Sequence, residues 1–169
     1  MTAAMAQAAP IGFTYGLVPR ETVFGMTGLE FLQKLVDRSL PAPPFAEASG
    51  IWISEVEEGR AVFEGRPSLR FYNPLGTVHG GWISTLIDSA MGCAVHTVLK
   101  AGQVYTTVDM NVSFVRPVFD KTGVLRCEGK IIHVGSRIAT SEGRVWDKAG
   151  TLIAHGTETC AIMNLPGAK

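Results

Sequence analysis

The segment that most restricts the fold is residues 82–99, a helix-length run without a wholly polar face. Its apolar side chains fall on every side of a helix, at Leu86, Ile87, Met91, Cys93, Ala94, Val95 and Val98. A helix that is apolar nearly all round is buried, in a protein core or in a membrane. Asp88 and His96 interrupt the run before it reaches the roughly twenty apolar residues of a membrane span. The rest of the chain must therefore cover this helix, and we expect a second chain to cover it as well.

Other periodic segments precede the apolar run. Residues 27–40 predict a helix, because leucines recur at spacings of three and four behind Thr27, a candidate N-cap. Prolines follow directly and end it. Residues 51–56 and 61–71 read as strands, and the short turn between them contains Gly59, which tolerates a positive φ. These two strands predict a β-hairpin.

Four Val-, Ile- and Thr-rich runs of near period two follow the apolar run, at residues 104–115, 124–133, 137–146 and 152–163. Polar and glycine-containing turns separate them, and this spacing is typical of an antiparallel meander. The whole order predicts an α+β fold in which one antiparallel sheet wraps round a long buried central helix, with an extra N-terminal helix. That arrangement is the hotdog fold.

The composition is that of one globular domain, because 46% of the 169 residues are hydrophobic and only 18% are charged. We place this domain at residues 27–165. Residues 1–26 are expected to form a disordered or extended N-terminal segment, and the leader lacks the features of a secretory signal. Fifteen basic side chains balance fifteen acidic ones, which argues against nucleic acid as a partner. The chain is not expected to enter a membrane.

The three cysteines, Cys93, Cys127 and Cys160, are widely spaced and form no C-x-x-C pair. They predict reduced core thiols and a cytoplasmic location, with neither a disulfide framework nor a zinc site. The sequence also lacks dinucleotide and phosphate-loop fingerprints and the H-E-x-x-H motif. We therefore expect no metal ion and no redox cofactor.

Asp88 is the single carboxylate between Glu64 and Asp109, and it lies in the middle of the apolar helix. It could be a structural residue that bonds to Ser84 or Thr85 one turn back. Alternatively, it could be a general base or nucleophile in a dry pocket, where loss of hydration raises its pKa.

The entrance to the same helix, residues 73–81, is rich in glycine. Gly80 and Gly81 leave backbone N–H groups uncovered at a helix N-terminus, which suits an oxyanion developing on a carbonyl. The structural alternative is a turn that only allows close packing. His79 is open to the same two interpretations, as a turn residue or as a base.

If the chain is an enzyme that uses both features in one site, their spacing predicts a dimer. Gly80 and Asp88 are eight residues apart, which is about 12 Å along one helix. A base must come within about 3 Å of its target, so one chain cannot bring both to the same carbonyl. If two chains lay these helices antiparallel about a two-fold axis, Asp88 of one would approach Gly80 of the other.

Three motifs in order resemble the phenylacetate-degradation type of hotdog acyl-CoA thioesterase, a branch of the 4-hydroxybenzoyl-CoA thioesterase superfamily. The resemblance covers about residues 50–163. It rests on Asn73-x-x-Gly76-x-Val78-His79-Gly80-Gly81 with Leu86-x-Asp88, then Thr107-Val108-Asp109-Met110-Asn111, then Arg116-Pro117.

The resemblance implies hydrolysis of an acyl-CoA to a free acid and coenzyme A, by a homodimer or a dimer of dimers. It implies that Asp88 is the base or nucleophile, that the Gly80 amide polarises the carbonyl, and that Asn73 assists. His79 matches a supporting histidine, and Thr107 matches the hydroxyl residue that completes the site. Strict strand alternation would instead place Thr106 on the apolar face.

Contacts to the substrate are expected at two further places. The resemblance implies coenzyme phosphate contacts at the turn Gly135, Ser136 and Arg137, although a plain turn remains an alternative. At the helix entrance, Gly81 could assist the carbonyl and Trp82 could contact the acyl chain.

Two rival functions remain open. A hotdog hydratase or dehydratase would need a strand-borne histidine and acid pair, and no such pair is evident. A non-catalytic acyl-CoA sensor or scaffold would keep the pocket without the base, so Asp88 argues against it.

Overall fold

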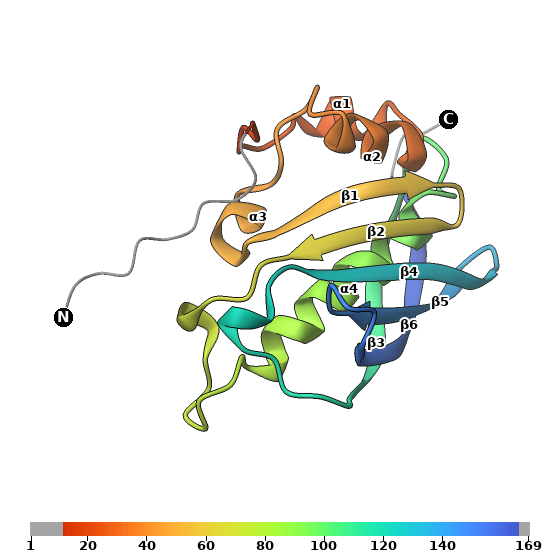
Figure 1. Cartoon of the computed structure of the whole chain (residues 1–169). Helices are drawn as coiled ribbons and strands as arrows, with labels where there is room; N and C mark the ends of the chain where they lie inside the picture. Colours follow the sequence, from red (N-terminus) through yellow and green to blue (C-terminus); the bar gives the residue numbers. More distant parts are fainter. Residues whose placement is uncertain (1–11, 166–169) are drawn as a thin grey trace.

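The computed structural model describes residues 12–165, which form a six-stranded antiparallel sheet that curls round one long helix (Figure 1). That helix is α4 (Gly80–His96). The strands are β1 (Ile51–Glu57), β2 (Arg60–Gly65), β3 (Gln103–Phe114), β4 (Leu125–Val134), β5 (Ile138–Trp146) and β6 (Leu152–Asn164). The expected hotdog fold, with its wrapped central helix and its extra N-terminal helix, is confirmed.

The strand order corrects one expectation. The sheet runs β1-β2-β4-β5-β6-β3, so β3 pairs with β6 at one edge and does not pair with β4. Only β4, β5 and β6 form a meander. The reason is the connection over residues 115–124, which holds Pro117 and the 3-10 turn η2 (Asp120–Thr122) and is far longer than a hairpin turn.

Helix α4 lies very close to the sheet because small residues form a row beneath it. Gly129 on β4 pairs with Gly143 on β5, which pairs with Gly156 on β6. A Cβ atom at Gly129 would collide with the carbonyl oxygen of Ala90, and one at Gly143 would stand 2.8 Å from side chains of α4. At Gly129 the helix backbone, and at Gly143 side chains of the helix, therefore occupy the space that a side chain of the sheet would take.

The N-terminal helices pack beside β1. Helix α2 (Gly28–Val36) begins at Thr27, which forms a capping box with Glu30, as its N-cap position predicts. The helix ends before residue 40, because Asp37 is the C-cap and Arg38 has a φ of 65°. Helices α1 (Arg20–Phe24) and α3 (Pro44–Ser49) are additional.

The structure differs from two further expectations, which concern the end of the second strand and the N-terminal segment. The strand expected over 61–71 ends at Gly65, because the chain turns through Pro67 into the 3-10 turn η1 (Leu69–Phe71). Of the segment expected to be disordered or extended, residues 1–11 lie outside the described residues. Its remainder contains α1 and an isolated bridge between Tyr15 and Ala42. Within residues 12–165 no helix is long and apolar enough to cross a membrane.

The glycine row yields a stability prediction. Gly129→Ala should lower the free energy of unfolding by about 1–3 kcal/mol, because the new methyl group meets helix backbone that must shift. Gly16→Ala is the matched control, since its Cβ would meet Pro41 at an ordinary 3.7 Å. Urea unfolding of both variants measures the difference. Equal stability of the two variants would contradict the proposed close packing.

Candidate functional site

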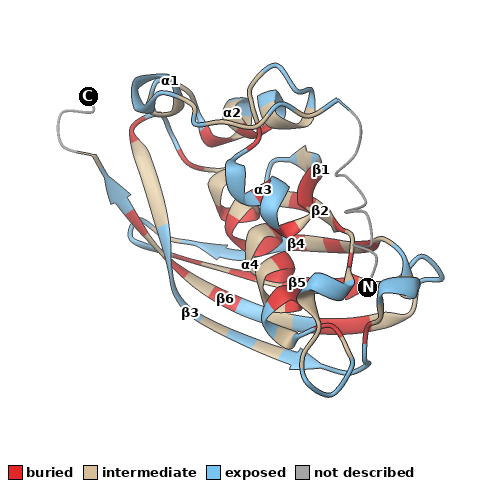
Figure 2. Cartoon of the chain, turned by 90° about the vertical axis from the view of Figure 1, so that its left-hand side faces the viewer, coloured by how far each residue is buried: buried red, intermediate tan, exposed pale blue. Residues whose placement is uncertain are grey.

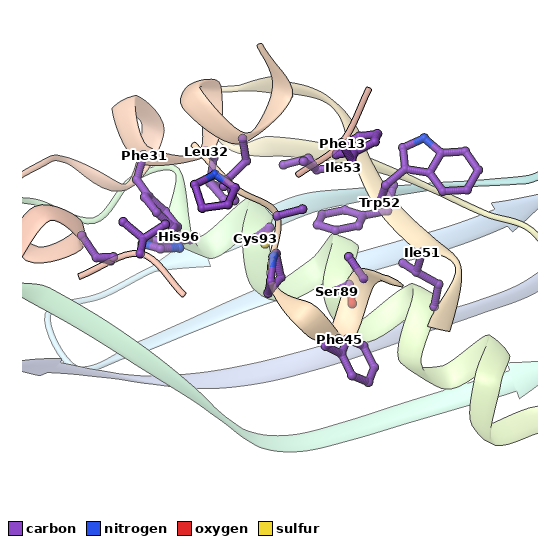
Figure 3. Close-up of a pocket in the computed structure, with 18 of the residues that line it drawn as sticks. Phe13, Phe31, Leu32, Phe45, Ile51, Trp52, Ile53, Ser89, Cys93 and His96 are labelled. Atoms are coloured by element: carbon purple, nitrogen blue, oxygen red, sulfur yellow. The ribbon is translucent and has the colours of Figure 1, made fainter. Parts of the chain in front are cut away.

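A mostly apolar cavity of about 390 Å³ lies between the N-terminal segment, β1, α4 and β3. Figure 3 shows Phe31, Leu32 and Ile53 on its walls, with Ser89 and Cys93 presented by α4. Its polar wall includes Asp88 on α4 and Thr107 on β3. The cavity therefore joins an apolar compartment to one carboxylate.

Asp88 is half-buried and contacts the neighbouring strand. Its Oδ1 atom accepts a hydrogen bond from the Thr107 hydroxyl at 3.3 Å. Burial raises the pKa of Asp88, and the hydrogen bond from Thr107 opposes that shift. Of the two partners in the structural alternative, Thr85 donates its hydroxyl to the Gly81 carbonyl instead. No hydrogen bond joins Ser84 to Asp88 among the described residues. Asp88 is thus a carboxylate with an elevated pKa on the wall of a cavity.

Thr107, rather than Thr106, faces Asp88 because β3 contains a bulge. The register shifts between Thr107 and Asp109, which leaves Val108 as the extra residue. Tyr105 and Thr107 point toward α4 before the bulge, and Met110 packs on the core after it. Strict alternation fails at this position, because one extra residue reverses which face each side chain takes.

Glu158 is a residue that the sequence reasoning missed. It lies on β6, is only 1% exposed, and accepts a hydrogen bond from the Thr107 hydroxyl at 2.8 Å. Burial and the charge of Asp88 raise its pKa to about 6, against hydrogen bonds from Cys160 and Thr107. Alternation along β6 could have found it, since Glu158 shares the inward face with Cys160 and Ile162.

The start of α4 assigns its two glycines different roles. His79 is the N-cap, and its Nδ1 accepts the Gly81 N–H at 2.8 Å. The Gly81 amide is therefore already engaged and does not point to a substrate oxygen. Gly80 is the first helical residue, so its N–H has no partner within the helix. Gly80 is the glycine that can present a donor.

Asn73 holds the loop that leads to this helix start. Its Oδ1 accepts the N–H groups of Leu75 and Thr77, and its Nδ2 donates to the Thr77 hydroxyl at 2.9 Å. Asn73 and Gly80 line a second hollow together with Phe114. This hollow shares no lining residue with the cavity that contains Asp88. Within one chain, Asp88 and Gly80 therefore line different hollows.

The remaining candidate residues lie elsewhere. Trp82 is buried, stacks on Phe71 and donates its indole N–H to the Ser49 carbonyl, so it packs the core. Gly135, Ser136 and Arg137 form the turn between β4 and β5, which the Gly135 N–H closes onto the Ile138 carbonyl. Trp82 and these three turn residues line neither hollow.

Other titratable groups on the cavity wall are held neutral. Burial lowers the pKa of His96 to about 4 and raises the pKa of Cys93 to about 12. His96 packs against the rings of Phe31 and Tyr105. Within the described part of the chain, no group of three or more His, Cys, Asp or Glu residues could hold a metal ion. Asp88 is thus the carboxylate available to a ligand in this cavity.

Comparison with known proteins identifies the family. The family model of the thioesterase superfamily matches residues 75–154. A solved structure from that superfamily is 33% identical with a TM-score of 0.65, over 81% of this chain and 99% of the other. A mutant of the phenylacetic acid degradation protein PaaI from Thermus thermophilus is 28% identical with a TM-score of 0.63, over 70% and 97% of the two chains.

Two curated relatives extend this comparison. Human acyl-coenzyme A thioesterase 13 is 27% identical over 136 residues, which is 79% of this chain and 95% of the relative. A Halobacterium salinarum protein provisionally classed as an esterase is 41% identical over 86 residues, and there the match spans only 49% of this chain and 54% of the relative. The sequence motifs and the matched structures both indicate a hotdog-fold thioesterase. The chain belongs to the thioesterase superfamily, a family of hotdog-fold thioester hydrolases.

Proposed function

We propose that this protein hydrolyses an acyl-CoA thioester to a free carboxylic acid and coenzyme A. The observation that carries the proposal is Asp88, a carboxylate of raised pKa that bonds to Thr107 on the wall of an apolar cavity. Membership of the thioesterase superfamily supports the reaction, and the name of the human relative supports coenzyme A as the thiol. The apolar cavity supports an uncharged aliphatic or aromatic acyl group.

In the proposed reaction, the thioester carbonyl accepts a hydrogen bond from the Gly80 N–H of one protomer. Asp88 of the partner takes a proton from water as the water oxygen attacks the carbonyl carbon. The carbon–sulfur bond then breaks, and the proton passes from Asp88 to the coenzyme A sulfur. Thr107 and Asn73 orient the reacting groups, and His79 supports the oxyanion site by capping the helix.

A homodimer follows from the separation of the two half-sites. Gly80 and Asp88 lie on one helix, about 12 Å apart, and open into different hollows. The edge strand β3 offers a surface for a second copy, because its outer side has no paired strand among the described residues and Val108 is 62% exposed. Figure 2 shows how little of β3 is covered. Pairing of two such edges would bring the halves of each site together.

The proposal also covers the binding of coenzyme A, the absence of a cofactor and the cellular location. We assign the phosphate groups of coenzyme A to Gly135, Ser136 and Arg137, where backbone N–H groups and a guanidinium can bind anions. The proposed site is shared by two chains. We therefore expect coenzyme A to contact this turn only in the assembled dimer or in a dimer of dimers. The reaction as written uses no metal ion and no redox cofactor, and we place it in the cytoplasm.

The role of Asp88 is tested by substitution. Asp88→Asn should lower kcat roughly 100-fold or more, because a positioned general base contributes that much, while the fold is kept. Turnover of an acyl-CoA panel, followed by trapping the released thiol, measures the effect. Glu58→Gln removes an exposed carboxylate in the β1–β2 turn and should leave kcat unchanged. Wild-type turnover by Asp88→Asn at saturating substrate would overturn the assignment.

The two-chain site is tested by complementation. Asp88→Ala and Gly80→Val chains should each be inactive alone, and mixing them should restore hydrolysis, because each heterodimer contains one undamaged site. Native mass spectrometry verifies that subunits have exchanged. Absence of activity in a verified heterodimer would refute the shared site, even if the Asp88 result stands.

A further inference from the structure

Glu158 occupies an unusual position for a carboxyl group. It lies on the inward face of β6, 1% exposed, and it lines neither hollow. Its Oε2 atom is buried without a hydrogen-bond partner among the described residues, and so is the hydroxyl of Ser141, which lies directly opposite on β5. A buried carboxyl group with an unsatisfied oxygen costs stability, so its presence calls for a functional explanation.

Thr107 links Glu158 to Asp88. The Thr107 oxygen lies 2.8 Å from Glu158 Oε1 and 3.3 Å from Asp88 Oδ1. A hydroxyl group has one proton, so it can donate to only one of the two carboxylates at a time. The shorter distance makes Glu158 the favoured acceptor, so the hydrogen bond to Asp88 is the weaker of two alternatives. Asp88 is then left with a weak contact while it is ionised, and it can donate to the Thr107 oxygen once it is protonated.

The surroundings of Glu158 supply no positive charge. Among the described residues, no cation contributes to the pKa of Glu158, whereas burial and the charge of Asp88 both raise it. The polar and titratable side chains that face it are, by element, Cys160 on β6, Tyr105 and Thr107 on β3, Ser141 on β5, and Asp88 and Cys93 on α4. Among the described residues, the repulsion between the two carboxylates is therefore opposed by hydrogen bonds from Thr107 and Cys160 but by no positive charge.

We propose that Glu158 is a positioning residue of this site: it fixes the direction of the Thr107 hydroxyl and, as a second negative charge, makes Asp88 a stronger base. The inference rests on the proposed role of Asp88 in hydrolysis. When Asp88 takes a proton from water, the repulsion disappears and a hydrogen bond from Asp88 to Thr107 forms. Both changes favour the protonated product of that step.

The two carboxylates, Asp88 and Glu158, determine in which direction activity changes with pH. The active form has both carboxylates ionised, so activity falls as the pH drops and the pair takes up its first proton. The pKa values of such a pair belong to both groups together. The charge of Asp88 raises the pKa of Glu158, and repulsion between two charges is mutual. Removing the charge of Glu158 should therefore lower the pKa of Asp88, which moves the acid limb of the pH profile to lower pH and weakens the base.

Glu158→Gln tests the proposal, because it keeps the shape and removes the charge. The acid limb of kcat/KM should move about one pH unit lower. The plateau kcat should fall roughly tenfold, with KM unchanged. Glu142→Gln is the matched control, since Glu142 is a half-buried glutamate on β5 that forms an ion pair with Arg144, and its profile should match the wild type. An acid limb that stays in place or moves to higher pH overturns the proposal, whatever happens to kcat.

Carbon-13 NMR titration of the side-chain carboxyl groups gives a readout without turnover. Asp88 should titrate at lower pH in Glu158→Gln than in the wild type. If that variant does not fold, the wild type alone decides, because the Asp88 and Glu158 signals should each show an inflection at the other's titration. Independent single-step titrations would refute the pair. Activity retained in Asp88→Asn would refute the proposed function instead and leave the titration result valid.

Discussion

The close approach of helix α4 to the sheet is the contact on which the other features depend. It exists because Gly129 leaves room for the helix backbone and Gly143 leaves room for side chains of the helix. Because the helix lies so close to the sheet, the sheet can curl round it and contact it from several strands (Figure 1). Helix α4 also contacts β3 and β6. A side chain such as Asp88 then has a defined distance to groups on both strands.

The polar residues of the site lie between helix α4 and the edge strand β3. Asp88 faces an apolar cavity on one side and the Thr107 hydroxyl on the other. The bulge at Val108 is what turns Thr107 toward α4, and a bulge next to a reactive group is a common way to aim a side chain. Behind Thr107, Glu158 adds charge without touching the cavity. Burial, strand register and one hydroxyl thus act together on a single carboxylate.

Periodicity was sufficient to predict the central helix and every strand to within a few residues, except for the early end of β2. Pairing was harder, because β3 joins β6 through contacts between residues far apart in the chain. The same limit applied to the site. Asp88 and Gly80 stand out along the chain, since one is a carboxylate in an apolar helix and the other a glycine at its start. The engagement of the Gly81 amide by His79 was not evident, because it depends on the orientation of one ring.

The sequence by itself therefore determined the element types, the buried helix, the position of its carboxylate and the resemblance to a thioesterase family. These depend on local periodicity and on residues close together in the chain. Only the tertiary structure decided the strand order, the choice of Thr107 over Thr106 and the place of Glu158 beside them. The strand order depends on pairing between residues far apart in the chain. The other two depend on strand register, because one bulged residue reverses the faces of a strand without any local signal that alternation could detect.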